Sequence, residues 1–362
     1  MHTLSKSNRP IRLAIALQGG GSHGAFTWGV LDRLLQEPAF EIVGISGTSA
    51  GAMNAAVLAD GLRRGGADEA RQALEHYWND VGSLPGYASF EAPALFGAER
   101  TWHLEHNPVF LWQEMLTRIC SPYESNPFNY HPLRSLLGRI DFEGLRGDPR
   151  AARLFICATN VRTGLRRVFE NHELSADVLL ASAALPQVYQ AVEIGGEHYW
   201  DGAYTGNPAL APLYLGTEAS DVIVVGINPI VRGEVPRTAR AISDRIGEIS
   251  FNSSFMGEVA AIAFFEELMQ SRPADPRFRR LFVHGIGDEA LGAFGASSKM
   301  NNHPEFLRHL HEIGRRAAEQ WLAEHRNAIG NRSTVDLSGL APTRHGSLIG
   351  PSIIKHRHEV KT

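Results

Sequence analysis

The chain has 362 residues, enough to bury a large core as one α/β domain with insertions or as one domain with a helical extension. Its formal net charge of −4 argues against nucleic-acid binding through bulk electrostatics. Two cysteines are too few for a disulfide framework, which indicates a reducing compartment. Residues 1–10 are polar and lack an apolar signal core, and no apolar run approaches the ~20 residues that a spanning helix needs. We therefore expect a cytoplasmic protein with a disordered N-terminus over 1–10.

The first predicted strand, 11–17, is apolar and runs directly into a glycine-rich segment, 18–25. A predicted helix over 26–35 follows, with apolar residues at three- and four-residue spacing. Glycines that end a strand and open a helix expose backbone N–H groups to an anion. The segment is therefore an anion-binding loop, and three kinds of site compete for it.

The first kind is a dinucleotide site, because Gly19, Gly21 and Gly24 match the pattern Gly-x-Gly-x-x-Gly. That fold also needs an acidic residue at the end of the second strand, and here the acid, Glu41, lies at its beginning. The second kind is a phosphate loop, which requires a Gly-Lys-Ser/Thr sequence that does not follow. The third is an oxyanion hole, whose N–H groups serve a serine on the neighbouring strand.

The second predicted strand supplies such a serine. Residues 41–45 are mostly apolar, Gly47-Thr-Ser49-Ala-Gly51 follows directly, and 52–62 read as a helix. Gly-x-Ser-x-Gly between a strand and a helix is typical of a nucleophile elbow, a turn so tight that its neighbours must lack bulk. Because only the oxyanion-hole interpretation explains two glycine clusters one strand apart, we favour it.

Residues 82–135 interrupt the alternation of strands and helices and are rich in aromatic side chains. These rings are Tyr87, Phe90, Phe96, Trp102, Phe110, Trp112, Tyr123, Phe128 and Tyr130. One interpretation is a lid or lipid-facing wall over Ser49. The other is that the rings pack the insertion onto its own domain.

Further strands are predicted over 153–159 and 221–227, then helices over about 239–271 and 304–328, with a strand ending at His284 between them. The stretch 251–265 carries an apolar stripe that belongs either to the active-site face or, more commonly, to the core or a subunit contact. Alternating strands and helices predict parallel pairing with right-handed crossovers.

Two further motifs complete a resemblance. Asp201-Gly202-Ala203 follows a short strand over 197–200, and Ala-Ser-Ala-Ala-Leu-Pro occupies 181–186. With the glycine loop and the serine elbow, these ordered motifs resemble the bacterial patatin-like phospholipase family over residues of about 11–215. The resemblance implies a three-layer α/β/α fold with a mostly parallel central sheet, an aromatic-rich insertion and a helical C-terminal extension.

The resemblance also implies the domain organisation and the site. The catalytic domain spans 11–230, a helical extension of the same domain spans 231–332, and 333–362 form an irregular tail. Ser49 is the nucleophile and Asp201 the base, without a histidine. Gly19, Gly20 and Gly21 shape the oxyanion loop, and the N–H of Ala50 adds a donor. No cofactor and no metal are implied.

Two histidines raise separate hypotheses. The family often carries Arg or Lys where this chain has His23, so a protonated His23 would support the oxyanion and make activity pH-dependent near neutrality. His284, at the end of a late strand, would instead complete an ordinary triad in the order Ser, Asp, His. The triple glycine and Asp-Gly-Ala motifs fit a dyad better.

The sequence therefore predicts a serine acyl hydrolase that cleaves carboxylic esters of lipids in the manner of a phospholipase A or lysophospholipase. A broad carboxylesterase, a polyester depolymerase or an acyltransferase would use the same residues. From another class, a nucleotide-binding protein would use Gly19, Gly21 and Gly24. The expected partner is a lipid or acyl-ester substrate, with peripheral contact to a membrane and no nucleic acid. The sequence gives no indication of the oligomeric state.

Overall fold

The computed structural model describes residues 10–86, 102–270 and 280–335. Residues 1–9 and 336–362, and with them nearly all of the expected disordered N-terminus and most of the expected irregular tail, lie outside the described residues.

An eight-stranded sheet forms the centre of the fold, in the order β5-β6-β3-β2-β1-β7-β8 with β4 paired to β3. The strands are β1 (Ile11–Leu17), β2 (Phe40–Gly47), β3 (Arg153–Asn160), β4 (Arg166–Glu170), β5 (Val192–Ile194), β6 (Glu197–Asp201), β7 (Asp221–Val225) and β8 (Phe282–Ile286). The pairings among β1, β2, β3, β7 and β8 are parallel, and those of β4, β5 and β6 are antiparallel. The predicted mostly parallel sheet is confirmed, although β4 and β5 were not predicted.

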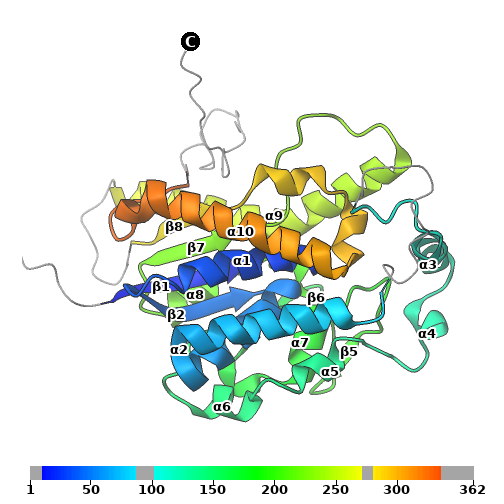
Figure 1. Cartoon of the computed structure of the whole chain (residues 1–362), viewed down its shortest axis with the longest axis horizontal. Helices are drawn as coiled ribbons and strands as arrows, with labels where there is room; N and C mark the ends of the chain where they lie inside the picture. Colours follow the sequence, from blue (N-terminus) through cyan, green and yellow to red (C-terminus); the bar gives the residue numbers. More distant parts are fainter. Residues whose placement is uncertain (1–9, 87–101, 271–279, 336–362) are drawn as a thin grey trace, which may run out of the picture.

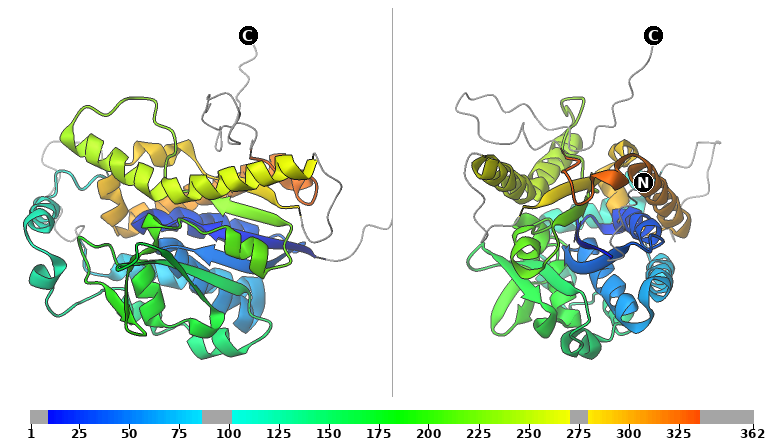
Figure 2. Two further views of the ribbon diagram at one scale, coloured as in Figure 1. Left: turned by 180° about the vertical axis from the view of Figure 1, so that it is seen from behind. Right: turned by 90° about the vertical axis from the view of Figure 1, so that its left-hand side faces the viewer.

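Helices cover both faces of this sheet (Figures 1 and 2). One face carries α1 (Gly24–Leu34), α2 (Ala50–Ser83), α7 (Ala176–Ser182) and α10 (Pro304–His325), and the other carries α8 (Ala211–Gly216) and α9 (Ala239–Gln270). The remaining α-helices of the described residues are α3 (Pro108–Ile119), α4 (Pro122–Ser125), α5 (Arg134–Leu137) and α6 (Phe142–Gly147). The three-layer α/β/α architecture is therefore confirmed.

Strand β1 is apolar on both of its faces, which explains why two helical layers are needed. Leu13, Ile15 and Leu17 belong to the core on the α1 face, whereas Ala14 and Ala16 belong to the core on the α9 face. Because successive side chains of a strand point to opposite faces, a continuous apolar run must be covered on both. The apolar stripe of α9 covers the second face, with Phe255 and Val259 buried in that core.

The register of the sheet brings several strand ends to one edge. The last residue of β1, Leu17, pairs with Gly47 of β2 on one side and with Val225 of β7 on the other. Gly47 also pairs with Ile156, and two residues further along β3 Ala158 pairs with Asp201 at the end of β6. The glycine loop, the serine elbow and Asp201 therefore share the carboxyl edge of the parallel strands.

The aromatic insertion is divided in its packing. Trp102 stacks on Phe306 of α10 with ring centroids 5.2 Å apart, as expected for an insertion packed on its own domain. Four other rings, Trp112, Tyr123, Phe128 and Tyr130, are exposed on and after α3 and α4. Tyr87, Phe90 and Phe96 lie outside the described residues. In Figure 1, α3 and α4 stand at one end of the molecule, where Glu114 of α3 pairs with Arg240 of α9. Within the described residues, no helix combines the length and apolarity needed to cross a bilayer.

Candidate active site

Ser49 lies in a strained turn between β2 and α2. Its φ of 54° and ψ of −122° fall in a region that residues other than glycine rarely occupy. The flanking glycines permit this turn, because a Cβ on Gly47 would lie 2.5 Å from the carbonyl oxygen of Gly51, and one on Gly51 would overlap the carbonyl oxygen of Leu17. The geometry is that of a nucleophile elbow, which presents the serine at the N-terminus of the following helix.

A second serine holds the backbone of this elbow. Ser182, fully buried at the end of α7, accepts a hydrogen bond from the N–H of Ser49 at 2.9 Å. Its own hydroxyl donates to the carbonyl of Cys157 in β3 at 2.7 Å. Ser182 belongs to the Ala-Ser-x-x-x-Pro stretch, so the motif was visible in the sequence but its contact was not.

Asp201 is buried, with 1% of its surface exposed, and faces Ser49. Its carboxylate accepts a hydrogen bond from the Ser49 hydroxyl and another from the N–H of Ala203, the latter at 2.8 Å. Burial raises the pKa of Asp201 to about 7, against the opposing effect of these two hydrogen bonds. A carboxylate with such a pKa can exchange a proton with a hydroxyl group near neutral pH.

The glycine loop packs directly on the elbow. A Cβ on Gly19 would lie 2.7 Å from the Cβ of Ser49, and Gly21 has a φ of 58°. The N–H of Gly19 donates to Oδ1 of Asn207 at 2.7 Å, so it is not free for a substrate. In the described part of the chain no protein acceptor is found for the N–H groups of Gly20, Gly21 and Ala50. Gly19 therefore shapes the loop, and the next two glycines carry its open donors.

The polar side chains that hold this loop were not predicted. Gln18 accepts hydrogen bonds from the N–H groups of Ile227 and Asn228 at 2.9 and 3.0 Å, and its own amide donates to the carbonyl of Asn207 at 3.3 Å. Asn228 in turn donates to the carbonyl of Gly19 at 2.7 Å. The only sequence signal was position, because Asn207 follows Asp201 by six residues and Asn228 follows a buried strand.

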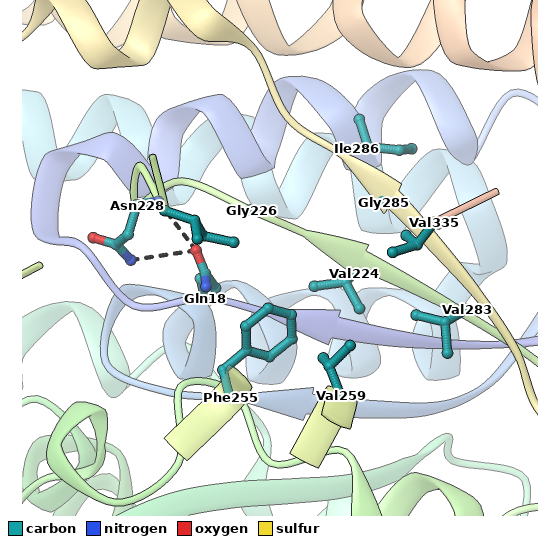
Figure 3. A pocket seen from close by; sticks show the side chains of 11 residues that line it. Gln18, Val224, Gly226, Asn228, Phe255, Val259, Val283, Gly285, Ile286 and Val335 are labelled. Atoms are coloured by element: carbon teal, nitrogen blue, oxygen red, sulfur yellow. Dashed lines mark hydrogen bonds between the residues drawn. The ribbon is translucent and has the colours of Figure 1, made fainter. Parts of the chain in front are cut away.

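A small apolar cavity lies beside Gln18, between α9 and strands β7 and β8 (Figure 3). Phe255, Val259, Val224 and Val283 are among its lining residues. Its volume of about 20 Å³ is close to that of one water molecule. It therefore cannot hold an acyl chain in this conformation.

The hypothesis that His23 supplies a cation near neutral pH is wrong. The ring is buried and Nε2 lies 2.7 Å from the hydroxyl of Ser298. Burial, followed by repulsion from the Lys299 ammonium, lowers the pKa of His23 to about 3. The imidazole is therefore neutral at physiological pH.

The triad alternative is also excluded by geometry. His284 is fully buried in the middle of β8, with Nε2 3.0 Å from Oδ1 of Asp221 and Nδ1 3.3 Å from the hydroxyl of Thr334. Asp221 begins β7, at the end of the strand opposite to the edge that holds Ser49. Three strand spacings of roughly 4.8 Å separate β8 from β2. His284 therefore forms a buried hydrogen-bonded pair with Asp221, away from the elbow.

An elbow serine bonded to a buried aspartate, beside a loop with open N–H groups, is an arrangement typical of serine hydrolases. Residues 15–214, more than half of the chain, match the family model described as patatin-like phospholipase, and the protein belongs to this family. Membership of the family implies a lipid acyl hydrolase activity.

Several solved structures are similar to this chain, among them the following two. VipD from Legionella pneumophila is 15% identical with a TM-score of 0.42, over 87% of this chain and 67% of that chain. The ExoU–SpcU complex from the type III secretion system of Pseudomonas aeruginosa is 16% identical with a TM-score of 0.35, over 87% of this chain and 52% of that chain. This chain thus spans about half the length of the latter. No curated protein matches the chain.

Proposed function

We propose that the protein hydrolyses carboxylic esters of lipids, as a phospholipase A or lysophospholipase does, through a dyad of Ser49 and Asp201. The observation that carries this proposal is the hydrogen bond from the Ser49 hydroxyl to a buried carboxylate whose pKa is raised to about 7. A serine hydroxyl is a weak nucleophile at neutral pH and needs a base within hydrogen-bond reach. A carboxylate of ordinary pKa would be a poor base for this purpose.

In the proposed reaction, Asp201 accepts the proton of Ser49 while the serine oxygen attacks the ester carbonyl. The N–H groups of Gly20, Gly21 and Ala50 stabilise the resulting oxyanion, and one such donor is typically worth roughly 2.7–4 kcal/mol. Asp201 then passes the proton to the departing alcohol. Water, activated by the same carboxylate, releases the acyl group from Ser49.

The same residues would serve a carboxylesterase, a polyester depolymerase or an acyltransferase. The first two differ in the ester that acylates Ser49, and the third passes the acyl group to an acceptor other than water. The nucleotide-binding alternative is less compatible with the loop, because both polar groups of Gly19 are bonded to protein side chains. Glu41 also lies at the start of β2, opposite Arg12, and not where a ribose would need it.

We also propose that the exposed side chains of α3, α4 and the turn after them contact the lipid surface. The large apolar or aromatic residues exposed here are Leu111, Trp112, Met115, Ile119, Tyr123, Phe128 and Tyr130. Trp and Tyr favour the interface between membrane and water. This segment contacts the stretch between Ala184 and β5, because Gln190 donates to the carbonyl of Asn126 at 2.8 Å and His131 stacks on Tyr189. Ala184 itself accepts a hydrogen bond from the N–H of Asp201.

Replacing Ser49 by alanine should abolish hydrolysis of p-nitrophenyl esters across a series from short to long acyl chains. The loss expected for a catalytic nucleophile is about a thousandfold or more in kcat. Ser46→Ala is the matched control, because Ser46 is a buried serine in β2, three residues before Ser49, and its hydroxyl has no partner in the described residues. Full activity of Ser49→Ala would rule the proposal out.

The pH dependence of kcat/KM should follow the ionisation of Asp201. Activity should rise with pH and level off above about 7, because the protonated carboxyl cannot accept the proton of Ser49. Between about pH 5 and about pH 9 the Asp201 carboxyl should pass from mostly protonated to mostly ionised. A flat wild-type profile over this range would contradict the assignment.

Asp201→Asn should be inactive yet more stable than wild type at pH 8. The native pKa of about 7 exceeds the ordinary 3.8, so ionisation destabilises the folded state increasingly from about pH 4 and fully above 7. A difference of about 3 units corresponds to roughly 4 kcal/mol at most. Thermal unfolding at pH 3.5 and pH 8 measures this, with Asp68→Asn at a 90% exposed side chain as the control. An asparagine variant less stable than wild type at pH 8 would refute this origin of the raised pKa.

The double variant Trp112→Ser, Ile119→Ser should bind phosphatidylcholine vesicles about tenfold or more weakly in a sedimentation assay, because two large exposed side chains no longer enter the lipid. Hydrolysis of a soluble short-chain ester should remain. Leu215→Ser removes an even more exposed apolar side chain from α8 and should change neither vesicle binding nor hydrolysis of the soluble ester. Unchanged vesicle binding in the double variant would argue against this surface.

A further inference from the structure

A cation is linked to the glycine loop through one side-chain amide. Lys299 follows β8 by thirteen residues, and its Nζ donates a hydrogen bond to Oδ1 of Asn228 at 2.7 Å. The Nδ2 of the same amide donates to the carbonyl oxygen of Gly19 at 2.7 Å. These two bonds form a chain from the ammonium group to the peptide that joins Gly19 and Gly20. Figure 3 shows Asn228 beside Gln18, where the loop begins.

The Gly19–Gly20 peptide is the point at which this chain reaches the proposed oxyanion hole. Its carbonyl belongs to Gly19 and its N–H to Gly20, so one planar group accepts from Asn228 and donates toward the substrate. Hydrogen bonds in series polarise one another, and bonds that involve an ionised group are the stronger ones. A bond accepted at the carbonyl therefore makes the Gly20 N–H a better donor.

We propose that Lys299 is a positioning residue that strengthens the Gly20 N–H as an oxyanion donor, acting through Asn228 and the Gly19 carbonyl. This inference rests on the proposed function, since it assumes that an oxyanion forms at the Ser49 acyl centre. The proposal gives Lys299 the role of a cation that supports the oxyanion, which the neutral His23 cannot perform.

Two carboxylates near Lys299 favour the charged form that this role requires. Burial lowers the pKa of Lys299, whereas Glu248 and Asp244 of α9 oppose that effect and Arg232 adds to it. The backbone of Lys299 is also part of the site, because its carbonyl oxygen fills the space that a Cβ on Gly21 would need.

The identity of the residue supports the same role. Lys299 is the only lysine among the described residues, whereas the other basic side chains there are arginines and histidines. A lysine ammonium is a compact charge that a single amide oxygen can accept.

The test is a double-mutant cycle with Lys299→Met and Asn228→Ala, assayed on a p-nitrophenyl ester. Lys299→Met should lower kcat about tenfold with little change in KM, because the lost interaction strengthens only in the transition state. In the Asn228→Ala background the same change should cost less than about twofold, since the relay is already broken. Lys299→Arg, which keeps a charged donor, should restore much of the rate.

A spectroscopic readout separates polarisation from a merely structural role. The carbonyl stretch of an acyl group on Ser49, measured by infrared difference with a ¹³C-labelled ester, should move to higher frequency in Lys299→Met because its hydrogen bonds weaken. Ser298→Ala is the matched control. Ser298 is a buried neighbour whose hydroxyl bonds to His23 and takes no part in the hydrogen bonds that join Lys299, Asn228 and Gly19. It should leave the carbonyl frequency unchanged.

Two results would overturn the inference: wild-type kcat and carbonyl frequency in Lys299→Met, or an equal loss in the presence and absence of Asn228. Failure of the proposed function has a different signature, because wild type would then be inert or Ser49→Ala would remain active.

Discussion

Three backbone turns meet at the carboxyl edge of the sheet at separations that leave no room for a β-carbon. Gly19 lies against Ser49, Gly51 against the end of β1, and Gly202 against the carbonyl of Cys157 in β3. Each turn belongs to a different strand, so the spacing of the strands sets the spacing of the functional groups. The strain at Ser49 persists because this packing leaves the elbow no alternative conformation. Substituting any of these glycines would displace a hydroxyl, a carboxylate or a loop of N–H groups from the others.

In the proposed mechanism, the base Asp201 combines reactivity with a cost in stability. Asp201 is held in an almost solvent-free position by its own backbone bonds and by Ala203, and burial raises its pKa toward neutrality. A group that ionises only with difficulty in the folded protein lowers stability at the pH at which it works. The surrounding sheet, covered on both faces by large apolar cores, supplies the stability that offsets this. Burial also keeps His23 neutral, so of two buried titratable groups near the loop one is the proposed base and the other is an uncharged packing residue.

Much of the fold and part of the site could be predicted from local pattern. The apolar runs of β1 and β2 and the glycines around Ser49 are short-range signals, and Asp201 was identified through a resemblance between motifs. The contacts of Ser182 with Ser49, of Asn207 and Asn228 with Gly19, and of Lys299 with Asn228 could not be predicted. They join residues at least 71 positions apart and depend on the three-dimensional register of the sheet. His23 misled the prediction for the same reason: its sequence position suggests a cation, whereas its burial and the neighbouring Lys299 determine its charge.

The central claim is that the hydrogen bond to Asp201 makes Ser49 a reactive nucleophile. The most direct test is to treat the protein with a long-chain alkyl fluorophosphonate, which phosphonylates activated serines, and to locate the adduct by peptide mass spectrometry. The account predicts a single adduct on Ser49 in wild type and little labelling in Asp201→Asn. An adduct on another serine, or equal labelling of Ser49 with and without the carboxylate, would contradict it.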